Sequence, residues 1–421
     1  MNTGNVQSIL GLPTLGTVHA LRCRECGKEY PPKKIYACEE CFGPLDVTYD
    51  YDAITIKKDQ FLNREKSLWR YIELLPIQDK NRIVNLGAGY TILHRGTNLG
   101  KLLGLKNLYI KDDTVNPTYS FKDRPASVAV SKAVEFGSTA VGCASTGNLA
   151  GATAAHAAKA EMPCYIFVPK DIESNKILQM SIYGAQIIAV NGTYDDANRL
   201  ATQAAEHYNW ALVNINIRPF YVEGSKTLAY EVCEQLDWTP PDRVIVPTAS
   251  GALLLAIHKG FREFEHVGLI KNNHVKICSA QGAGCSPIVT AFKSKSDEIR
   301  PIEKPATLAK SLAIGDPADG LYALRTIRET GGSAEYATDD EIVDAIQMLA
   351  RTEGIFTEPA GWVTIACLKK MAESGIIDQD ETVVCYITGN GLKTSEALSS
   401  KIPHLVGVEP TLKALADIVN L

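Results

Sequence analysis

From about residue 100 to residue 400 the sequence alternates short apolar runs with segments of helix length, and this alternation limits the possible folds more than any other feature. Runs such as 107–111, 138–144 and 163–169 are typical of strands, and segments such as 124–137 and 149–160 are typical of helices. Continuous apolar strands that alternate with helices favour parallel sheets covered by helices on both faces. The sequence therefore predicts an α/β fold built from parallel open sheets.

Size and charge narrow the classes of function. The chain has 421 residues, 45% of them apolar, which is enough for the cores of more than one lobe. The net charge of −5 and the lack of a Lys/Arg run predict no nucleic-acid partner, and no apolar stretch is long enough for a membrane span. The N-terminus lacks a signal-peptide pattern, and seven of the eleven cysteines are scattered as buried thiols usually are. We therefore expect a cytoplasmic protein in a reducing compartment.

Four cysteines near the N-terminus form two Cys-x2-Cys pairs with eleven residues between them: Cys23, Cys26, Cys38 and Cys41. Two such turns can complete a tetrahedral thiolate site for Zn²⁺. All four positions are cysteine, so the predicted ion is structural and leaves no position open to a substrate. Two disulfides or free thiols are the alternatives, and the reducing compartment disfavours the disulfides. The segment is too short to bury a core, and zinc binding supplies about 10–16 kcal/mol.

Strand-to-helix turns are the places to look for chemistry, because ligands of parallel sheets bind beyond the carboxyl ends of the strands. One turn places Lys122 at a helix entrance beside Phe121, where burial favours the neutral amine that forms a Schiff base with an aldehyde cofactor. Another, residues 145–148, offers hydroxyls and backbone amides to a carboxylate, and the Asn148 side chain is suited to a phenolate oxygen. Taken alone, each has a plain alternative: a solvent-facing lysine and an ordinary N-cap.

Two later turns complete the set. Residues 248–252 are small, so their backbone N–H groups can approach a phosphate closely, although a tight turn is the simpler reading of this loop alone. Thr388 ends a strand and carries a neutral hydroxyl suited to a pyridine nitrogen. Together the four turns supply an aldehyde partner, a ring-oxygen donor, a phosphate cradle and a ring-nitrogen partner, which are the contacts that pyridoxal phosphate needs.

With these residues in hand, the chain resembles the threonine synthases, which belong to the fold-type II pyridoxal-phosphate enzymes. Counterparts of their motifs occur in the same order over about residues 21–400: the cysteine pairs, LWRY at 68–71, SFKDR at 120–124, STGN at 145–148, EGSKT at 223–227, SLAIGDPADG at 311–320 and TGNGLK at 388–393. The resemblance implies a two-lobed fold with a cleft between the lobes. The implied parts are a zinc ribbon-like segment at 1–50, a large cofactor-binding lobe at 51–114 and 216–400, a small lobe at 115–215 and a tail at 401–421.

The resemblance also implies the activity. Threonine synthases convert O-phosphohomoserine and water to threonine and phosphate, by γ-elimination followed by addition of water at the β-carbon. Lys122 would bind the cofactor covalently and exchange protons with the amino-acid substrate. The implied cofactor contacts are Lys122, Asn148, Thr248, Ala249, Ser250, Gly251, Ala252 and Thr388. The implied substrate contacts are Ser145, Thr146, Arg218 and Lys226, of which Lys226 is equally well read as a solvated helix lysine. A homodimer is implied as well.

Three positions depart from the family pattern. Ile92 lies in the run Gly-Tyr-Thr-Ile-Leu, where the family often has Gly-Thr-Pro-Leu. Tyr221 stands where some members carry an arginine. Trp362 stands where the family commonly has a small residue, and its indole either reshapes the pocket or fills core. These departures leave room for a related enzyme of β-replacement or β-elimination on serine, threonine or an O-phospho amino acid. A non-catalytic zinc-ribbon module on a degenerate fold is disfavoured, because the lysine and the phosphate loop are both present.

Overall fold

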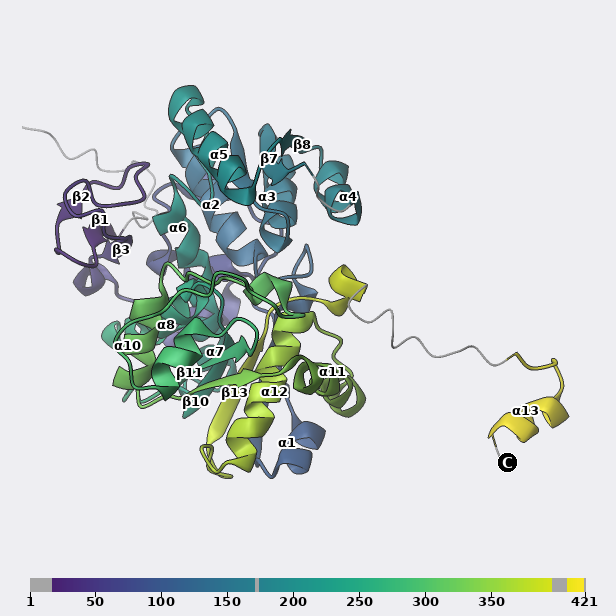
Figure 1. Ribbon diagram of the computed structural model, residues 1–421. Helices are drawn as coiled ribbons and strands as arrows, with labels where there is room; N and C mark the ends of the chain where they lie inside the picture. Colours follow the sequence, from purple (N-terminus) through teal and green to yellow (C-terminus); the bar gives the residue numbers. More distant parts are fainter. Residues whose placement is uncertain (1–16, 171–173, 396–406, 420–421) are drawn as a thin grey trace, which may run out of the picture.

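The computed structural model describes residues 17–170, 174–395 and 407–419. Three separate sheets organise these residues (Figure 1). Two of them are built mainly from parallel strands and covered by helices, so the predicted α/β fold is confirmed. None of the helices in these three ranges is both long enough and apolar enough to cross a membrane.

The first sheet is small and antiparallel. Its strands are β1 (Val18–Cys23), β2 (Glu29–Tyr30) and β3 (Leu45–Tyr49), in the order β2-β1-β3. The cysteine pairs lie at the end of β1 and in the loop between β2 and β3. Residues 1–16 of the predicted N-terminal segment lie outside the described residues.

The second sheet has six strands in the order β12-β11-β10-β13-β5-β4. The strands are β4 (Ile92–Arg95), β5 (Asn107–Asp112), β10 (Arg243–Pro247), β11 (Lys276–Gly282), β12 (Ala334–Ala337) and β13 (Thr382–Ile387). All neighbours are parallel except β4, an antiparallel edge strand that the sequence pattern did not reveal. Val244 and Val246 of β10 enter one apolar core and Ile245 enters another, because successive side chains of a strand point to opposite faces.

Helices cover both faces of this sheet. The core that holds Ile245 is completed by α1 (Thr97–Leu103), α11 (Asp339–Glu353) and α12 (Pro359–Glu373). The core that holds Val244 is completed by α7 (Thr227–Gln235), α8 (Ala252–His266), α9 (Pro287–Lys293) and α10 (Gly320–Glu329). A strand buried on both faces has to be apolar throughout, which is why β10 reads as a continuous run.

The third sheet has four parallel strands in the order β8-β7-β6-β9: β6 (Val141–Ala144), β7 (Cys164–Pro169), β8 (Gln186–Val190) and β9 (Ala211–Leu212). Its helices are α2 (Asp123–Glu135), α3 (Asn148–Lys159), α4 (Ser174–Ile182) and α5 (Tyr194–Tyr208). Phe167 packs with α5 in one core, whereas Ile166 and Val168 pack with α2 and α3 in the other. The alternation along β7 places helices on both faces here too.

The remaining elements are short. Helix α6 (Arg218–Glu223) follows the third sheet, and α13 (Leu412–Val419) lies apart from the sheets (Figure 1). Short 3-10 helices are η1 (Tyr51–Ala53), η2 (Lys58–Asn63), η3 (Leu68–Leu74), η4 (Lys80–Arg82), η5 (Asp113–Val115), η6 (Gly224–Lys226) and η7 (Lys310–Leu312). The seven scattered cysteines are all buried and unpaired, as predicted: Cys143, Cys164, Cys233, Cys278, Cys285, Cys367 and Cys385.

Candidate active site

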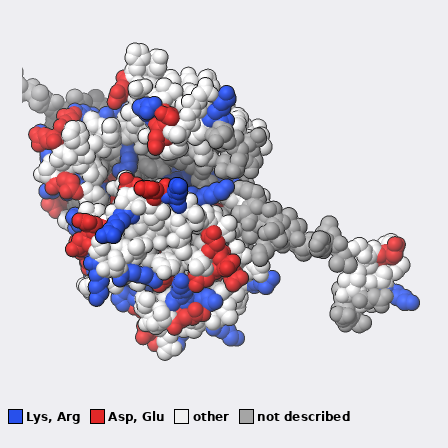
Figure 2. All heavy atoms as spheres, viewed as in Figure 1, with Lys and Arg blue, Asp and Glu red and all other residues white. Residues whose placement is uncertain are grey.

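Most of the residues singled out in the sequence line one cavity of about 730 Å³. Its lining includes Lys122, residues 145–148, residues 248–252 and Thr388. The last three follow directly after β6, β10 and β13, so the cavity lies at the carboxyl edges of both parallel sheets. The molecular surface is hollowed between the part that carries α5 and the part that carries α8, with charges of both signs on the rim (Figure 2). Turns that are distant in sequence thus meet at one site.

Lys122 is the residue immediately before α2, and its side chain is half-buried. Its Nζ donates a hydrogen bond to the Tyr221 hydroxyl at 2.9 Å and lies 4.5 Å from the centre of the Phe121 ring. Lys122 forms no ion pair with a carboxylate of any described residue. An amine that faces rings and one hydroxyl, rather than a carboxylate, is available to an aldehyde in the cavity.

A buried ion-pair cluster fixes the start of α2 beneath Lys122. Arg124 is fully buried and donates to Asp113 at 2.6 and 2.8 Å and to Glu231 at 2.8 Å. Lys111 also lies 2.7 Å from Glu231. Although burial acts to raise it, the charges of Arg124 and Lys111 bring the pKa of Glu231 down to about 2. Since each charge has a partner, the cluster holds the lysine-bearing turn against α7 and η5.

The 145–148 turn opens the 12-residue helix α3. The side chains of Ser145 and Thr146 are half-buried and Gly147 is exposed, so two hydroxyls and the first amides of the helix face the cavity. A helix N-terminus favours negative charge, which suits this turn to a carboxylate. The Asn148 side chain is also half-buried and donates to Glu358 at 2.8 Å.

The 248–252 turn opens the 15-residue helix α8. Thr248 is 1% exposed and donates to the carbonyl of Val246 at 2.9 Å. Gly251 has φ +100°, and a Cβ there would lie 2.8 Å from the carbonyl oxygen of Asp319. Only glycine fits that position without strain. The turn is therefore shaped by packing, with the Ser250 hydroxyl and the amides at the start of α8 toward the cavity.

Glu358 is a cavity residue that sequence reasoning missed. Its carboxylate lies between the two sides of the site, accepting from Asn148 at 2.8 Å and from the Thr388 hydroxyl at 3.4 Å. The residue is 4% exposed, and burial raises the pKa of Glu358 even though the Asn148 hydrogen bond acts to lower it. The available signal was an acidic residue at the start of a helix, directly before Pro359.

The structure does not bring Lys226 or Arg218 into this cavity. Lys226 is fully buried and pairs with Glu223 at 2.6 Å and Glu263 at 2.9 Å, so it is neither a solvated lysine nor a cavity residue. Arg218 pairs with Asp319 and lines a different cavity, of about 740 Å³, between α8, α10 and the N-terminal sheet. Among the described residues, the lysine that lines the 730 Å³ cavity besides Lys122 is Lys310, on η7 in the SLAIGDPADG run.

The three departures from the family pattern have different places in the structure. Trp362 is fully buried in the core, where its indole N–H donates to the Thr357 carbonyl at 2.6 Å, so it fills core and does not line the cavity. Ile92 is 52% exposed on β4, also away from the cavity. Tyr221 lines the cavity and contacts Lys122. Only this third departure bears on the site.

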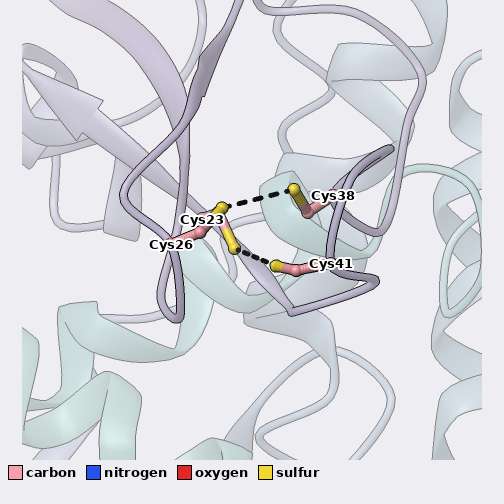
Figure 3. Close-up of side chains that lie close together, drawn as sticks. All are labelled: Cys23, Cys26, Cys38 and Cys41. Atoms are coloured by element: carbon pink, nitrogen blue, oxygen red, sulfur yellow. Dashed lines mark hydrogen bonds between the residues drawn. The ribbon is translucent and has the colours of Figure 1, made fainter.

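The four N-terminal cysteines form one cluster (Figure 3). Their sulfur atoms all lie within 4.8 Å of one another, and the Cys23–Cys41 and Cys26–Cys38 separations are 3.4 and 3.6 Å. Sulfurs that share a tetrahedral zinc ion at about 2.3 Å lie about 3.8 Å apart. All four are unpaired in the structure. The chemistry of the four thiols fits a structural metal.

Comparison with known proteins agrees with the geometry. The model of the family "Pyridoxal-phosphate dependent enzyme" matches residues 84–389. The threonine synthase of Methanocaldococcus jannaschii is 44% identical over 403 residues, covering 95% of this chain and 99% of that protein. The threonine synthase of Methanosarcina acetivorans is 39% identical, covering 96% and 99%. The chain belongs to the threonine synthase family of pyridoxal-phosphate-dependent enzymes.

Solved structures show the same fold at lower identity. A fungal L-serine ammonia-lyase from Rhizomucor miehei superposes with a TM-score of 0.63 at 20% identity, over 74% of this chain and 96% of that one. The processed threonine deaminase isoform 2 of Solanum lycopersicum gives 0.61 at 21%, over 73% and 85%. A model of the NinF protein also matches residues 22–45, the segment of the cysteine pairs.

The donor set of the cavity fits the cofactor of the threonine synthase family. Lys122 offers an amine, Asn148 an amide, Thr388 a hydroxyl and the 248–252 turn a helix N-terminus, all within the same 730 Å³ cavity. Gly251, at φ +100° and packed against the Asp319 backbone, fixes the turn whose N–H groups would approach the phosphate.

Proposed function

We propose that this chain converts O-phosphohomoserine and water to threonine and phosphate, with pyridoxal phosphate in the 730 Å³ cavity. One observation carries the proposal: an amine without a carboxylate partner, Lys122, shares that cavity with Asn148, the 248–252 turn and Thr388. The threonine synthases that match nearly the whole chain support the choice of reaction.

Four elements would hold the cofactor. The Ser250 hydroxyl and the N–H groups at the start of α8 bind its phosphate, Asn148 its ring oxygen and Thr388 its ring nitrogen, while Lys122 binds its aldehyde carbon. When bound, pyridoxal phosphate supplies a ring that spreads the negative charge left at the substrate α-carbon. Glu358 accepts from both Asn148 and Thr388 and so keeps these two side chains oriented.

The other residues of the cavity act on the substrate. Ser145 and Thr146 bind its carboxylate at the start of α3 and orient its α-carbon toward Lys122. Lys122 Nζ, freed when the substrate amine takes its place on the cofactor, would then accept the α-proton, and the Tyr221 hydroxyl, 2.9 Å away, would keep that nitrogen in place. Lys310, which lines the same cavity, takes the role of cation for the leaving phosphate that was predicted for Lys226 and Arg218.

We infer that each of the two larger sheets is the centre of one lobe. We assign the small lobe to residues 115–215, which carry β6 to β9, and the large lobe to residues 51–114 and 216–400. We assign a structural Zn²⁺ to the four clustered cysteines. Elemental analysis of the purified chain is expected to give about one zinc per chain, and the quadruple Cys→Ser variant none. The homodimer and the cytoplasmic location stay predictions.

A product assay tests the reaction. Purified protein with pyridoxal phosphate and O-phosphohomoserine is expected to release phosphate and threonine in equal amounts, and Lys122→Ala to release neither. A keto acid formed from serine or threonine, with no phosphate from O-phosphohomoserine, would instead establish the β-elimination alternative. The β-elimination alternative stays in the test because Tyr221, a departure from the family pattern, lies in the cavity, whereas Ile92 and Trp362 do not.

A further inference from the structure

One arginine of the N-terminal sheet reaches the large lobe. Arg24 lies between Cys23 and Cys26, and its guanidinium donates to both carboxylate oxygens of Asp46 on β3 at 2.7 Å each. The same guanidinium donates to the carboxylate of Asp319 at 3.0 Å. Asp319 precedes α10, nearly 300 residues further along the chain, and its side chain is 2% exposed. The cysteine cluster is thus tied to the large lobe through one side chain.

The backbone of Asp319 packs directly against the 248–252 turn. Its backbone N–H donates to the carbonyl of Ser250 at 3.0 Å. A Cβ on Gly251 would lie 2.8 Å from the carbonyl oxygen of Asp319. A shift of the Asp319 backbone therefore moves the turn directly, because no side chain lies between them to absorb the displacement.

The carboxylate of Asp319 also accepts from Arg218 of α6. Helix α6 carries Tyr221, the hydrogen-bond partner of Lys122. A buried carboxylate is stable only when it is paired, and here the two guanidinium groups of Arg24 and Arg218 pair with separate oxygens. Loss of either arginine leaves part of this charge uncompensated and releases one constraint on Asp319.

We propose that Arg24 is a positioning residue for the active site, which acts through Asp319 to hold the 248–252 turn in the conformation that binds a phosphate monoester. The N-terminal sheet then contributes to cofactor affinity although no residue of it lines the 730 Å³ cavity. The inference rests on the proposed function, because it takes the cofactor phosphate to bind at that turn.

The test compares two aldehydes that differ only in the phosphate. The coenzyme-free full-length chain is titrated with pyridoxal phosphate and, separately, with pyridoxal, and each dissociation constant is read from the visible absorption of the bound aldehyde. The variants are Arg24→Gln and Asp319→Asn. Arg22→Gln is the matched control, because Arg22 is an exposed arginine on β1, two residues before Arg24, and has no ion-pair partner among the described residues.

Arg24→Gln is expected to raise the dissociation constant of pyridoxal phosphate about tenfold and to change that of pyridoxal less than about twofold, since only the phosphate contact is disturbed. Arg22→Gln is expected to match the wild type for both ligands. If Asp319→Asn does not fold, Arg24→Gln still decides, because the Arg24 side chain is 18% exposed and its loss leaves no fully buried gap.

Two results overturn the inference while the proposed function stands. One is an Arg24→Gln variant that binds pyridoxal phosphate like the wild type. The other is an equal loss for pyridoxal phosphate and pyridoxal, which indicates general damage to the fold and not a role at the phosphate. A wild-type chain that takes up neither aldehyde refutes the proposed function itself, and the inference with it.

Discussion

The two helix N-termini that face the cavity are built in opposite ways. The turn before α8 is locked: Thr248 is 1% exposed, and Gly251, at φ +100°, packs against the backbone of Asp319. The turn before α3 is open: Gly147 is exposed, and a Cβ there would meet no atom within 4 Å. A locked turn suits a group that stays bound through every cycle, and an open turn suits one that enters and leaves. The comparison assigns the cofactor phosphate to the first and the substrate carboxylate to the second.

The same substitution at the two glycines gives the largest expected contrast. Gly251→Ala forces a Cβ against Asp319 at a left-handed φ. We expect this variant to bind pyridoxal phosphate with a dissociation constant at least about tenfold higher. Gly147→Ala, at φ −127°, is expected to leave that affinity unchanged. Titration monitored by visible absorption measures both. Equal losses at the two positions would break the distinction between the turns.

Removing the hydroxyls of the open turn is expected to have the next largest effect. Ser145→Ala and Thr146→Ala each delete a hydrogen bond to a carboxylate, so KM for the amino-acid substrate should rise about tenfold. The dissociation constant of pyridoxal phosphate should not change, because neither hydroxyl belongs to the locked turn. Steady-state kinetics at saturating cofactor give the first value and the titration gives the second. A loss of cofactor affinity with constant KM would exchange the roles of the two turns.

Tyr221 connects Lys122 to α6, and both residues line the cavity. Tyr221→Phe keeps the ring and deletes one neutral hydrogen bond, so kcat should fall about three- to tenfold with little change in KM. Tyr194→Phe is a matched control, because Tyr194 lines the same cavity and donates to the carbonyl of Ala144 without touching Lys122. A kcat that falls equally in both variants would show that the contact with Lys122 has no special role.

The smallest expected effect is a pH dependence at Glu358, which joins the two sides of the cavity. Burial raises the pKa of Glu358 above its ordinary 4.5, so the folded protein retains a proton that the unfolded chain has lost. The stability from that proton is complete below the unfolded pKa and is lost as the pH rises through the folded pKa. Glu358→Gln is neutral at every pH. The Tm of the variant minus the Tm of the wild type should therefore increase by a few degrees as the pH rises from acid to neutral. Differential scanning calorimetry without cofactor measures the gap, and a constant gap would contradict the burial argument.

Much of this architecture could be predicted from local sequence, because parallel strands buried on both faces read as continuous apolar runs and their carboxyl ends locate the turns. The cavity residues Lys122, Asn148 and Thr388 follow from that rule, and the cysteine cluster follows from its spacing. Contacts between distant segments could not be predicted in the same way. Nothing local to Lys226 reveals that it is buried between Glu223 and Glu263, and nothing local to Glu358 reveals the two donors that meet it.

Trp362 and Tyr221 also show that local sequence does not reveal which residues line the cavity. Both stood out as departures from a pattern, and the sequence could not tell which one lies in the cavity. The answer depends on which face of its helix each residue occupies relative to a neighbouring sheet: Trp362 packs into the core of the large sheet, and Tyr221 faces Lys122.

The position of the covalent bond to the cofactor tests the account most directly. The full-length chain is saturated with pyridoxal phosphate, reduced with borohydride and digested, and the modified peptide is identified by mass spectrometry. We expect the reduced cofactor on Lys122, and a Lys122→Ala variant that carries none. A modification on Lys310, Lys393 or any other lysine in place of Lys122, or a chain that takes up no cofactor at all, would contradict it.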